Sequence, residues 1–221
     1  MERVKFGLLG AGGFAREVMP FLKGSVAKTL LVPEKDIDAY FVETWQPKEP
    51  LVNGYSVLSL DEFIQLEGRK YFNVAVGSGR DRKAMVVKVG SSAEPLMLLA
   101  PQTTILDCNI IGTGSVFCPN TMVTSNAKIG KFFQCNIYAY VAHDCVIGDF
   151  VTFAPGVRCN GRVHIDDYAY IGTNAVIREG TSEKPLRIGK GAVIGMGAVV
   201  TKDVPAGATV IGNPARLMEK R

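Results

Sequence analysis

The chain has 221 residues, of which 47% are hydrophobic and 21% charged, and its formal net charge is +4. This composition is typical of a folded globular protein and argues against a disordered chain. The positive charge is not gathered into a dense run, and no apolar stretch reaches the roughly 20 residues that cross a bilayer, so we expect neither nucleic-acid binding nor membrane insertion.

The beginning of the chain and its cysteines predict a cytoplasmic protein. Residues 1–5 are not followed by a long apolar segment with a cleavage site, which argues against export. The five cysteines are odd in number and show no CxxC spacing, which favours free thiols over disulfides.

The first hundred residues predict alternating strands and helices. The first strand runs through the turn Gly10-Ala11-Gly12-Gly13 into a helix that extends toward Leu22. Ser59, with Glu62 three residues later, is typical of a helix N-cap. The predicted strands are 4–9, 40–42 and 72–76, and the predicted helices start near Gly13, at 58–66 and after Gly79. This alternation favours a small parallel α/β sheet in a domain of residues 1–100.

From Ile105 onward every sixth residue is Ile, Val, Phe or Cys, thirteen times without a miss. The positions are Ile105, Ile111, Phe117, Val123, Ile129, Cys135, Val141, Ile147, Phe153, Cys159, Ile165, Ile171 and Ile177. A second rank of mostly small residues, from Ser115 to Ala175, repeats with the same period. A helix drifts out of phase with a period of six, and a strand alternates every two residues. The pattern is typical of a parallel β-helix, in which three hexapeptides close one triangular coil.

We expect the β-helix to occupy residues 101–221, with the joint near Ala100-Pro101. The period slips by one between Ile177 and Ile188, where glycine, proline and charged residues indicate a loop that bulges from one corner. The period alone does not determine the hand of the coil.

The chain contains two histidines, and the period separates them. His143 lies two residues after the inward Val141, at an outward corner beside Asp144, whereas His164 is expected on a flat exterior face. Gly161 lies one coil beyond His143, where a missing side chain would leave a backbone N–H and room for a ligand. A base, a carboxylate that orients it and an N–H donor are the parts of an acyl-transfer site. Without that context, a corner histidine is an ordinary solvated side chain.

Four features together resemble one known family: the hexapeptide repeat, the segment Val141–Asp149, the ending Ile211–Arg216 and the opening Gly10–Gly13. The chain is similar to the sialic acid O-acetyltransferase NeuD/PglD-like family of sugar acetyltransferases. The resemblance implies a Rossmann-like N-terminal domain that binds a sugar nucleotide, followed by a left-handed parallel β-helix that binds acetyl-CoA. It also implies a homotrimer with acetyl-CoA between adjacent prisms.

The resemblance further implies residue roles. His143 matches the general base of a direct attack on the thioester, and Asp144 matches its acidic neighbour. Thr152 stands where some relatives carry a second histidine near the cofactor. The implied coenzyme-binding residues are Thr152, Gly161, Thr173, Gly195, Met196 and Gly197. The implied acceptor-binding residues are Gly12, Gly13, Phe14, Glu43, Thr44 and Gly77.

Several residues of the N-terminal domain suit a phosphorylated ligand. Gly12, Gly13 and Phe14 lie at a helix N-terminus, where backbone N–H groups attract phosphate. Arg80 and Arg82 follow the third strand and either meet a diphosphate or lie solvated at the surface.

The implied function is acetyl-CoA-dependent N-acetylation of a nucleotide-linked amino sugar, such as a UDP- or dTDP-4-amino-4,6-dideoxy hexose, in glycan biosynthesis. A sugar O-acetyltransferase of the sialic-acid type would use the same histidine. Two other classes stay open: an NAD-dependent oxidoreductase, because Gly10-x-Gly12-x-x-Ala15 fits a loose dinucleotide motif, and a noncatalytic β-helix binding module. Two separated histidines and scattered thiols predict no metal site.

Overall fold

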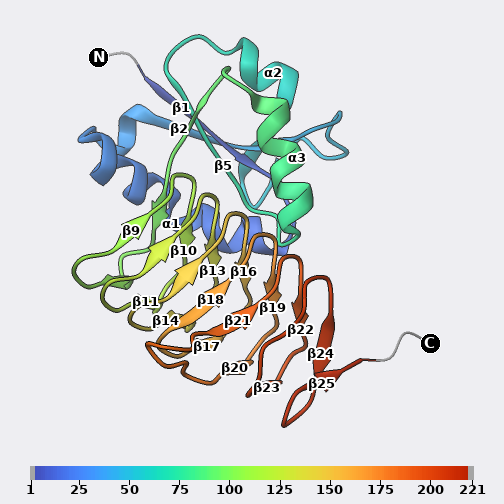
Figure 1. Cartoon of the computed structure of the whole chain (residues 1–221). Coiled ribbons are helices and arrows are strands. Elements are labelled where there is room, and N and C mark those ends of the chain that lie inside the picture. The colour runs from blue at the N-terminus through green and yellow to red at the C-terminus, as the bar shows by residue number, and fades with distance from the viewer. Residues whose placement is uncertain (1–2, 219–221) are drawn as a thin grey trace. The chain divides into compact units, whose positions relative to one another are not determined.

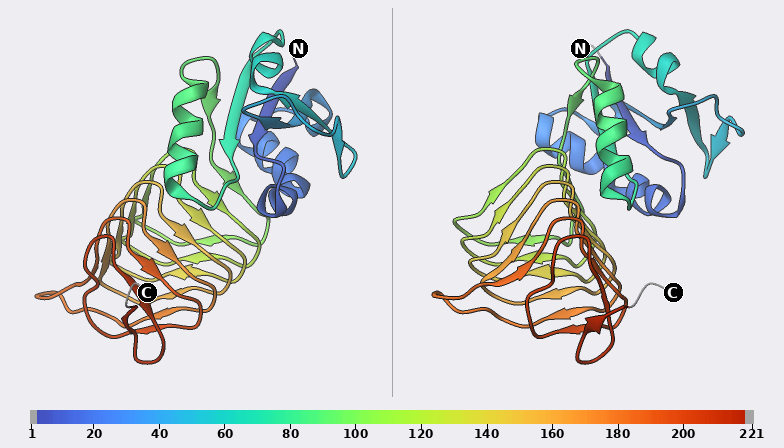
Figure 2. Two further views of the ribbon diagram at one scale, coloured as in Figure 1. Left: turned by 90° about the vertical axis from the view of Figure 1, so that its right-hand side faces the viewer. Right: turned by 45° about the vertical axis from the view of Figure 1, so that its right-hand side comes forward.

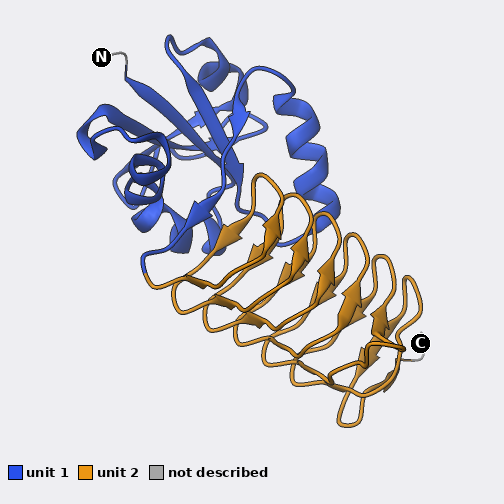
Figure 3. Ribbon diagram, turned by 60° about the vertical axis from the view of Figure 1, so that its left-hand side comes forward, with its two compact units in different colours: residues 1–101 blue, residues 102–221 orange. Residues whose placement is uncertain are grey.

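The computed structural model describes residues 3–218. The chain forms two compact units that divide between Pro101 and Gln102 (Figure 3). Among the described residues, no helix is long and apolar enough to cross a bilayer.

The first unit is built on a six-stranded sheet with the strand order β3-β4-β2-β1-β5-β6 (Figure 1). All neighbouring strands are parallel except β3 and β4, which pair antiparallel. The strands are β1 (Val4–Leu9), β2 (Ile37–Glu43), β3 (Leu51–Val52), β4 (Tyr55–Ser59), β5 (Lys70–Val74) and β6 (Glu94–Pro95), with β7 (Leu98–Leu99) after them. The helices are α1 (Gly13–Leu30), a 3-10 helix (Glu34–Asp36), α2 (Leu60–Gln65) and α3 (Gly79–Val89).

Helix α2 begins at the cap predicted from the sequence. The Ser59 hydroxyl oxygen accepts a hydrogen bond from the Glu62 N–H at 3.2 Å, and the Glu62 carboxylate accepts one from the Ser59 N–H at 2.7 Å. These reciprocal bonds satisfy two N–H groups that have no partner within the helix. The bonds that the Glu62 carboxylate accepts from the Ser59 N–H and from the Ser59 hydroxyl lower the pKa of Glu62 below its usual value.

Helix α1 is longer than predicted. It continues past Leu22 to Leu30, although Pro20 and Gly24 lie inside it. The buried side chains Val18, Leu22 and Val26 recur at four-residue intervals along one face. Their burial outweighs the local cost of proline and glycine, because tertiary packing commonly overrides helix propensity.

The second unit is a parallel β-helix. Its strands form three sheets, which are the three faces of a triangular coil stack (Figure 2). The first face consists of β8 (Thr104–Ile105), β11 (Met122–Val123), β14 (Tyr140–Val141), β17 (Arg158–Cys159), β20 (Val176–Ile177) and β23 (Val199–Val200). The second face contains β10 (Val116–Phe117), β13 (Gln134–Cys135), β16 (Thr152–Phe153), β19 (Tyr170–Ile171), β22 (Val193–Ile194), β24 (Thr209–Ile211) and β25 (Arg216–Leu217). The third face consists of β9 (Ile110–Ile111), β12 (Lys128–Ile129), β15 (Val146–Ile147), β18 (Val163–Ile165) and β21 (Leu186–Ile188).

The hexapeptide period predicted this arrangement strand by strand. Each of the thirteen sixth-position residues is the last residue of one strand, from β8 to β20. Those from Phe117 to Ile177 are buried, and only Ile105 and Ile111, in the first coil, are partly exposed. The second rank from Ser115 to Ala175 is buried as well. The core of this unit therefore runs as two ranks of side chains along the inside of the coils.

Aromatic rings fill part of this interior. The Phe133 ring is fully buried and packs edge-on against the rings of Phe117 and Phe153, at centroid distances of 5.7 and 5.0 Å. Such edge-to-face pairs are favourable beyond the area that they bury.

The coils stay in register across eighteen residues until a loop interrupts them. Val116 pairs with Gln134 and Tyr140 with Arg158, each eighteen residues further on. His164 then pairs with Arg187, which is 23 residues further on, so the coil between them holds five extra residues. The extra residues lie where the period slips, and the strand ladder continues on both sides of them.

Candidate active site

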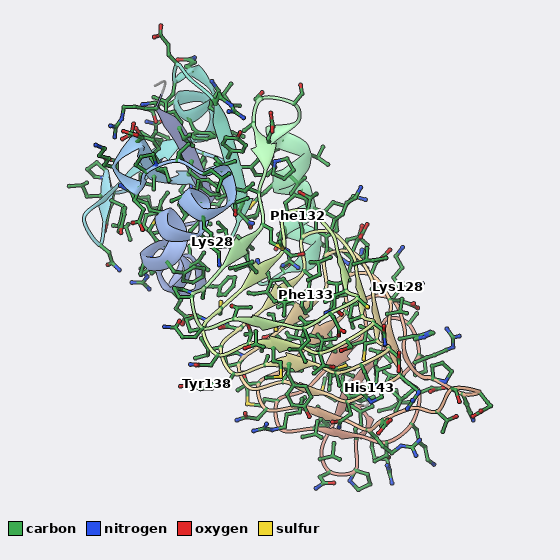
Figure 4. All side chains as sticks on the ribbon, turned by 90° about the vertical axis from the view of Figure 1, so that its left-hand side faces the viewer. Lys28, Lys128, Phe132, Phe133, Tyr138 and His143 are labelled. Atoms are coloured by element: carbon green, nitrogen blue, oxygen red, sulfur yellow. The ribbon has the colours of Figure 1, made fainter. Side chains whose placement is uncertain are left out.

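His143 lies in the turn between β14 and β15, at an edge of the coil stack (Figure 4). The next residue, Asp144, has φ of 58°, a left-handed conformation that aspartate tolerates better than most side chains. The turn exposes both side chains, at 43% for His143 and 42% for Asp144, so a ligand in solvent can reach them.

The carboxylate of Asp144 fixes the imidazole of His143. Asp144 Oδ2 lies 2.8 Å from His143 Nδ1. An ionised carboxylate only accepts hydrogen bonds, so the proton of a neutral imidazole lies on Nδ1 and the lone pair lies on Nε2. The hydrogen bond from His143 is the main reason why the pKa of Asp144 is lowered, and Arg162 adds to the effect. Asp144 is therefore ionised at neutral pH, and Nε2 is the atom able to take a proton.

Gly161 lies directly beside the imidazole, one coil further on. A Cβ atom at Gly161 would be 2.5 Å from Cε1 and 2.6 Å from Nε2 of His143. Such distances are shorter than van der Waals contact permits. The sequence predicted that the missing side chain would leave room for a ligand. In the structure the imidazole itself fills that space, so Gly161 seats the ring.

Two further charged residues complete the cluster, and the sequence analysis missed both. Glu179 Oε1 lies 3.7 Å from His143 Nε2, on the side of the ring opposite the Asp144 bond. Arg162 donates to Glu179 Oε1 at 2.7 Å and lies 3.8 Å from Asp144 Oδ2. Glu179 is eighteen residues after Gly161, so one more step of the coil period would have found it.

The residues implied to bind coenzyme divide between two corners and one strand. Gly161 lies with His143 at the corner that follows β14 and β17. Thr173 lies at the corner before β20, where its carbonyl accepts the Gly197 N–H at 2.8 Å, and so Gly195, Met196 and Gly197 lie beside it. The two corners border the first face on either side. Thr152 is different, because it lies in β16 on the second face and is only 6% exposed.

The N-terminus of α1 is open at the glycine-rich turn. Gly12 is the N-cap residue and provides no side-chain cap, and the first turn carries no acidic residue. A Cβ atom at Gly12 or Gly13 would meet nothing within 4 Å, and both glycines are exposed. Phe14 is half-buried in the same turn. Unpaired N–H groups at such a terminus attract anions.

The carboxyl end of β2 lies against this turn. The Ala11 N–H donates to the carboxylate of Glu43, which is the last residue of β2, while partial burial raises the pKa of that carboxyl. Thr44 and Trp45 follow, and together with Asp61 and Lys88 they line a cavity of about 340 Å³. Trp45 was not singled out from the sequence, although its side chain is 59% exposed.

The sequence predicted that the two arginines after β5 either meet a diphosphate or lie solvated at the surface. Neither expectation holds for both of them. Gly77 and Ser78 lead into α3, and Arg80 in its first turn is exposed. Arg82 is fully buried and donates to the carbonyl of Val76 at 2.6 Å. Arg82 is therefore not a solvated surface residue. It does not reach a diphosphate either, because its guanidinium is buried and hydrogen-bonded to the backbone.

His164 lies outside the cluster. It is half-buried in β18 on the third face, where its neighbours in the ladder are Val146 and Arg187. Burial is the main reason why the pKa of His164 is lowered, so it is largely neutral at pH 7. Between residues 3 and 218, no three His, Cys, Asp or Glu side chains are placed to hold a metal ion.

Cys145 follows the cluster in sequence but points inward. Its side chain is fully buried, with Sγ 3.2 Å from the carbonyl of Asn160. We expect Cys145→Ala to lower the free energy of unfolding by about 1 kcal/mol, because it removes buried atoms. The rate should stay within about twofold of the parent. Denaturant unfolding and initial rates check this, and a large loss of rate in the folded variant would contradict the structural role.

Comparison with known proteins identifies relatives over nearly the whole chain. GDP-perosamine N-acetyltransferase from Escherichia coli O157:H7 is 45% identical over 217 residues, which cover 97% of this chain and 96% of that protein. WeeI from Acinetobacter baumannii AYE is 49% identical, with a TM-score of 0.89, and the match covers 97% of this chain and 100% of WeeI. The acetyltransferase domain of PglB from Neisseria gonorrhoeae FA1090, in complex with acetyl coenzyme A, is 28% identical with a TM-score of 0.82, over 98% of this chain and 100% of that domain. No protein-family model matches the chain.

Proposed function

This chain belongs to the NeuD/PglD-like family of hexapeptide-repeat sugar acetyltransferases, and on that premise we propose that its acceptor is GDP-perosamine. The chain is an acetyl-CoA-dependent N-acetyltransferase that acts on a nucleotide-linked amino sugar. The sequence favoured a uridine or thymidine diphosphate, and we choose the guanosine diphosphate that the 45% identical relative carries in its name. The observation that carries the function is the imidazole of His143, held at Nδ1 by Asp144 at an exposed corner.

His143 acts as the general base in a single transfer step. The acceptor nitrogen attacks the thioester carbonyl carbon, and Nε2 takes a proton from that nitrogen as the C–N bond forms. The C–S bond then breaks, and the imidazolium returns the proton to the leaving thiolate. Asp144 holds the ring with Nε2 unprotonated and stabilises the imidazolium through the Nδ1–H bond. No group on the protein becomes acylated.

The coenzyme lies along the first face in this proposal. That face joins the corner of His143 and Gly161 to the corner of Thr173 and Gly197, so an extended molecule laid across it touches both. Thr152 is on the second face of the same prism, so a contact to the same coenzyme would come from a neighbouring subunit. A coenzyme bound between adjacent prisms requires such a neighbour, and we propose a homotrimer of left-handed β-helices in the cytoplasm.

The first unit binds the nucleotide in this proposal, as a Rossmann-like domain. Its parallel strand order places the carboxyl ends of β1 and β2 side by side, and ligands of such sheets bind beyond those ends. The diphosphate faces the N–H groups of Gly12 and Gly13 at the start of α1. The bond between Ala11 and Glu43 keeps that turn close to the cavity at Trp45.

The cavity after β2 suits a guanine base. The indole of Trp45 offers a flat surface for stacking. The Asp61 carboxylate can accept from two adjacent N–H groups, which guanine presents on one edge and uracil and thymine do not. These two features of the cavity lining support the guanosine nucleotide over the pyrimidine nucleotides.

The proposal is tested by incubating the purified chain with acetyl-CoA and GDP-perosamine, UDP-linked amino sugars or dTDP-linked amino sugars. Thiol release and product mass report transfer. We expect turnover of GDP-perosamine at a kcat/KM at least tenfold above the others, since good base recognition is worth about 1–3 kcal/mol. Turnover only of a UDP or dTDP sugar would overturn the choice of nucleotide. NADH binding without acetyl transfer would favour an oxidoreductase instead.

Replacing Trp45 by alanine should raise the KM for GDP-perosamine about tenfold, because the stacking surface is lost. The KM for acetyl-CoA and the kcat should change little, since Trp45 belongs to the first unit. Trp45→Phe keeps an aromatic ring and should recover most of the affinity. Initial rates over a range of acceptor concentrations measure the change, and a KM equal to that of the parent in Trp45→Ala would remove Trp45 from the base site.

A further inference from the structure

The carboxylate of Glu179 lies in the cluster but has no role in the mechanism derived above. Asp144 holds Nδ1 of His143, but Glu179 faces the opposite nitrogen, with Oε1 3.7 Å from Nε2. Nε2 is the atom that takes the proton in the proposed reaction, so whatever lies between it and Glu179 is the reacting group. The inference below rests on the proposed function.

The coil register and one ion pair hold Glu179 in this position. The Arg162 N–H donates to the His143 carbonyl at 3.0 Å, and the Gly180 N–H donates to the Gly161 carbonyl at 3.0 Å, so three successive coils stack at this corner. The Arg162 guanidinium then donates to Glu179 Oε1 at 2.7 Å. Glu179 is nevertheless 49% exposed, so an incoming ligand can reach its carboxylate.

Nε2 and Oε1 do not satisfy each other. A separation of 3.7 Å is too long for a hydrogen bond, and with the imidazole proton on Nδ1 both atoms are acceptors. Oε1 accepts from Arg162 and has a second lone pair for another donor. Nε2 of His143 and Oε1 of Glu179 are therefore two acceptors close enough to bind one donor group between them. The bond from His143 to Asp144 uses neither of these atoms, because it is made by Nδ1.

A protonated primary amine fits this pair, and a hydroxyl does not. If a nitrogen lay about 2.8 Å from both acceptors, the angle Nε2···N···Oε1 would be about 80°. Two N–H bonds of a tetrahedral nitrogen could then point at both acceptors with only modest bending of the hydrogen bonds. A hydroxyl has one hydrogen and can donate to only one of the two. The negative charge of Glu179 also favours an ammonium over a neutral group.

We propose that Glu179 binds the protonated amino group of the acceptor against His143 Nε2 and thereby makes the site selective for an amine over a hydroxyl. The protons balance across the reaction. The ammonium nitrogen carries three: one is released to solvent before the attack, which frees the lone pair of the nitrogen, one then passes through Nε2 to the thiolate as the C–N bond forms and the C–S bond breaks, and one remains on the product amide. Glu179 positions the nitrogen and needs no net change of protonation.

Direct binding separates this role from a structural one. We compare the affinity of Glu179→Gln and of the parent for two ligands at pH 7, by calorimetry without acetyl-CoA. The ligands are GDP-perosamine and the GDP-sugar in which a hydroxyl replaces the amino group. Glutamine keeps the size of the side chain and removes the charge. We expect about tenfold weaker binding of GDP-perosamine and unchanged binding of the hydroxyl analogue, because a hydrogen bond between ions is about twice as strong as a neutral one.

The pH dependence gives a second readout. The titratable groups that face Glu179 are His143 and Arg162, and the further charges near Arg162 are Asp144 and Glu183. The difference between parent and variant should shrink as the pH rises through the pKa of the ligand's own amine, since a neutral amine gains nothing from the charge. The hydroxyl analogue should show no such trend. A difference that stays constant across this range would contradict the proposal.

The matched control is Glu183→Gln, which removes an exposed carboxylate from the same loop, where it pairs with Ser182. Its affinity for GDP-perosamine should equal that of the parent. If Glu179 only steadied Arg162 and Asp144, Glu179→Gln would lower kcat and leave both affinities unchanged, and that result would overturn the inference. Failure of the parent to acetylate any amino-sugar nucleotide would instead overturn the proposed function, so the two failures are distinguishable.

Discussion

Replacing His143 by alanine should reduce kcat by about 10² to 10⁴ while the protein stays folded. The loss is expected because Nε2 is the proton acceptor, and neither Asp144 nor Glu179 can present a base at the same point. The side chain is 43% exposed at a turn, so its removal leaves the buried ranks of the β-helix intact. Steady-state rates with acetyl-CoA and GDP-perosamine measure the effect, and thermal unfolding checks the fold.

The second histidine of the chain provides the control. His164→Ala removes an imidazole of the same kind from β18 on the third face, away from the corner that carries Asp144 and Gly161. Its rate should stay within about threefold of the parent. An unchanged rate in His143→Ala, or an equal loss in both variants, would remove His143 from the mechanism.

Gly161→Ala should lower kcat by about 100-fold through steric displacement alone. The new Cβ would lie 2.5 Å from Cε1 and 3.0 Å from Nδ1 of His143, so the ring must move. The movement breaks the alignment with Asp144, and a misplacement of about 1 Å can cost about 10²-fold in rate. The φ angle of Gly161 is outside the left-handed region, so alanine adds no backbone strain there.

A double variant tests this explanation. In His143→Ala the space beside Gly161 is empty, so adding Gly161→Ala should cost no further activity. Strong non-additivity between the two substitutions is the signature of direct contact. Losses that multiply would show that Gly161 acts independently of the imidazole, for example through its own N–H.

The β-helix was the most predictable part of the fold, because each position of the six-residue repeat has the same environment in every coil. The sixth-position residues Phe117 to Ile177 all face inward, so their identity reports burial directly. The first unit was less predictable, since the short strands β3, β6 and β7 carry little periodicity. The helix α1 was predicted only toward Leu22, whereas it extends to Leu30 with Val26 buried in its last turns.

The part of the site that was predictable is the part that follows from the eighteen-residue period of the coils. That period placed His143 beside Gly161, but it specified columns of residues and not side-chain directions. It therefore suggested open space where the imidazole lies, and it gave no sign that Arg162 bridges two carboxylates. The burial of Arg82 was also invisible, because a charged residue after a turn is normally solvated.

The constant register of the coils has a consequence for how such chains can change in length. Inserting or deleting eighteen residues elsewhere in the repeat adds or removes one whole rung, and every column above and below keeps its members. Between His143, Gly161 and Glu179 the spacing is not free in this way, because a rung inserted there would separate residues that must lie on successive coils at one corner. Relatives with longer or shorter prisms should therefore gain or lose rungs outside the segment from His143 to Glu179.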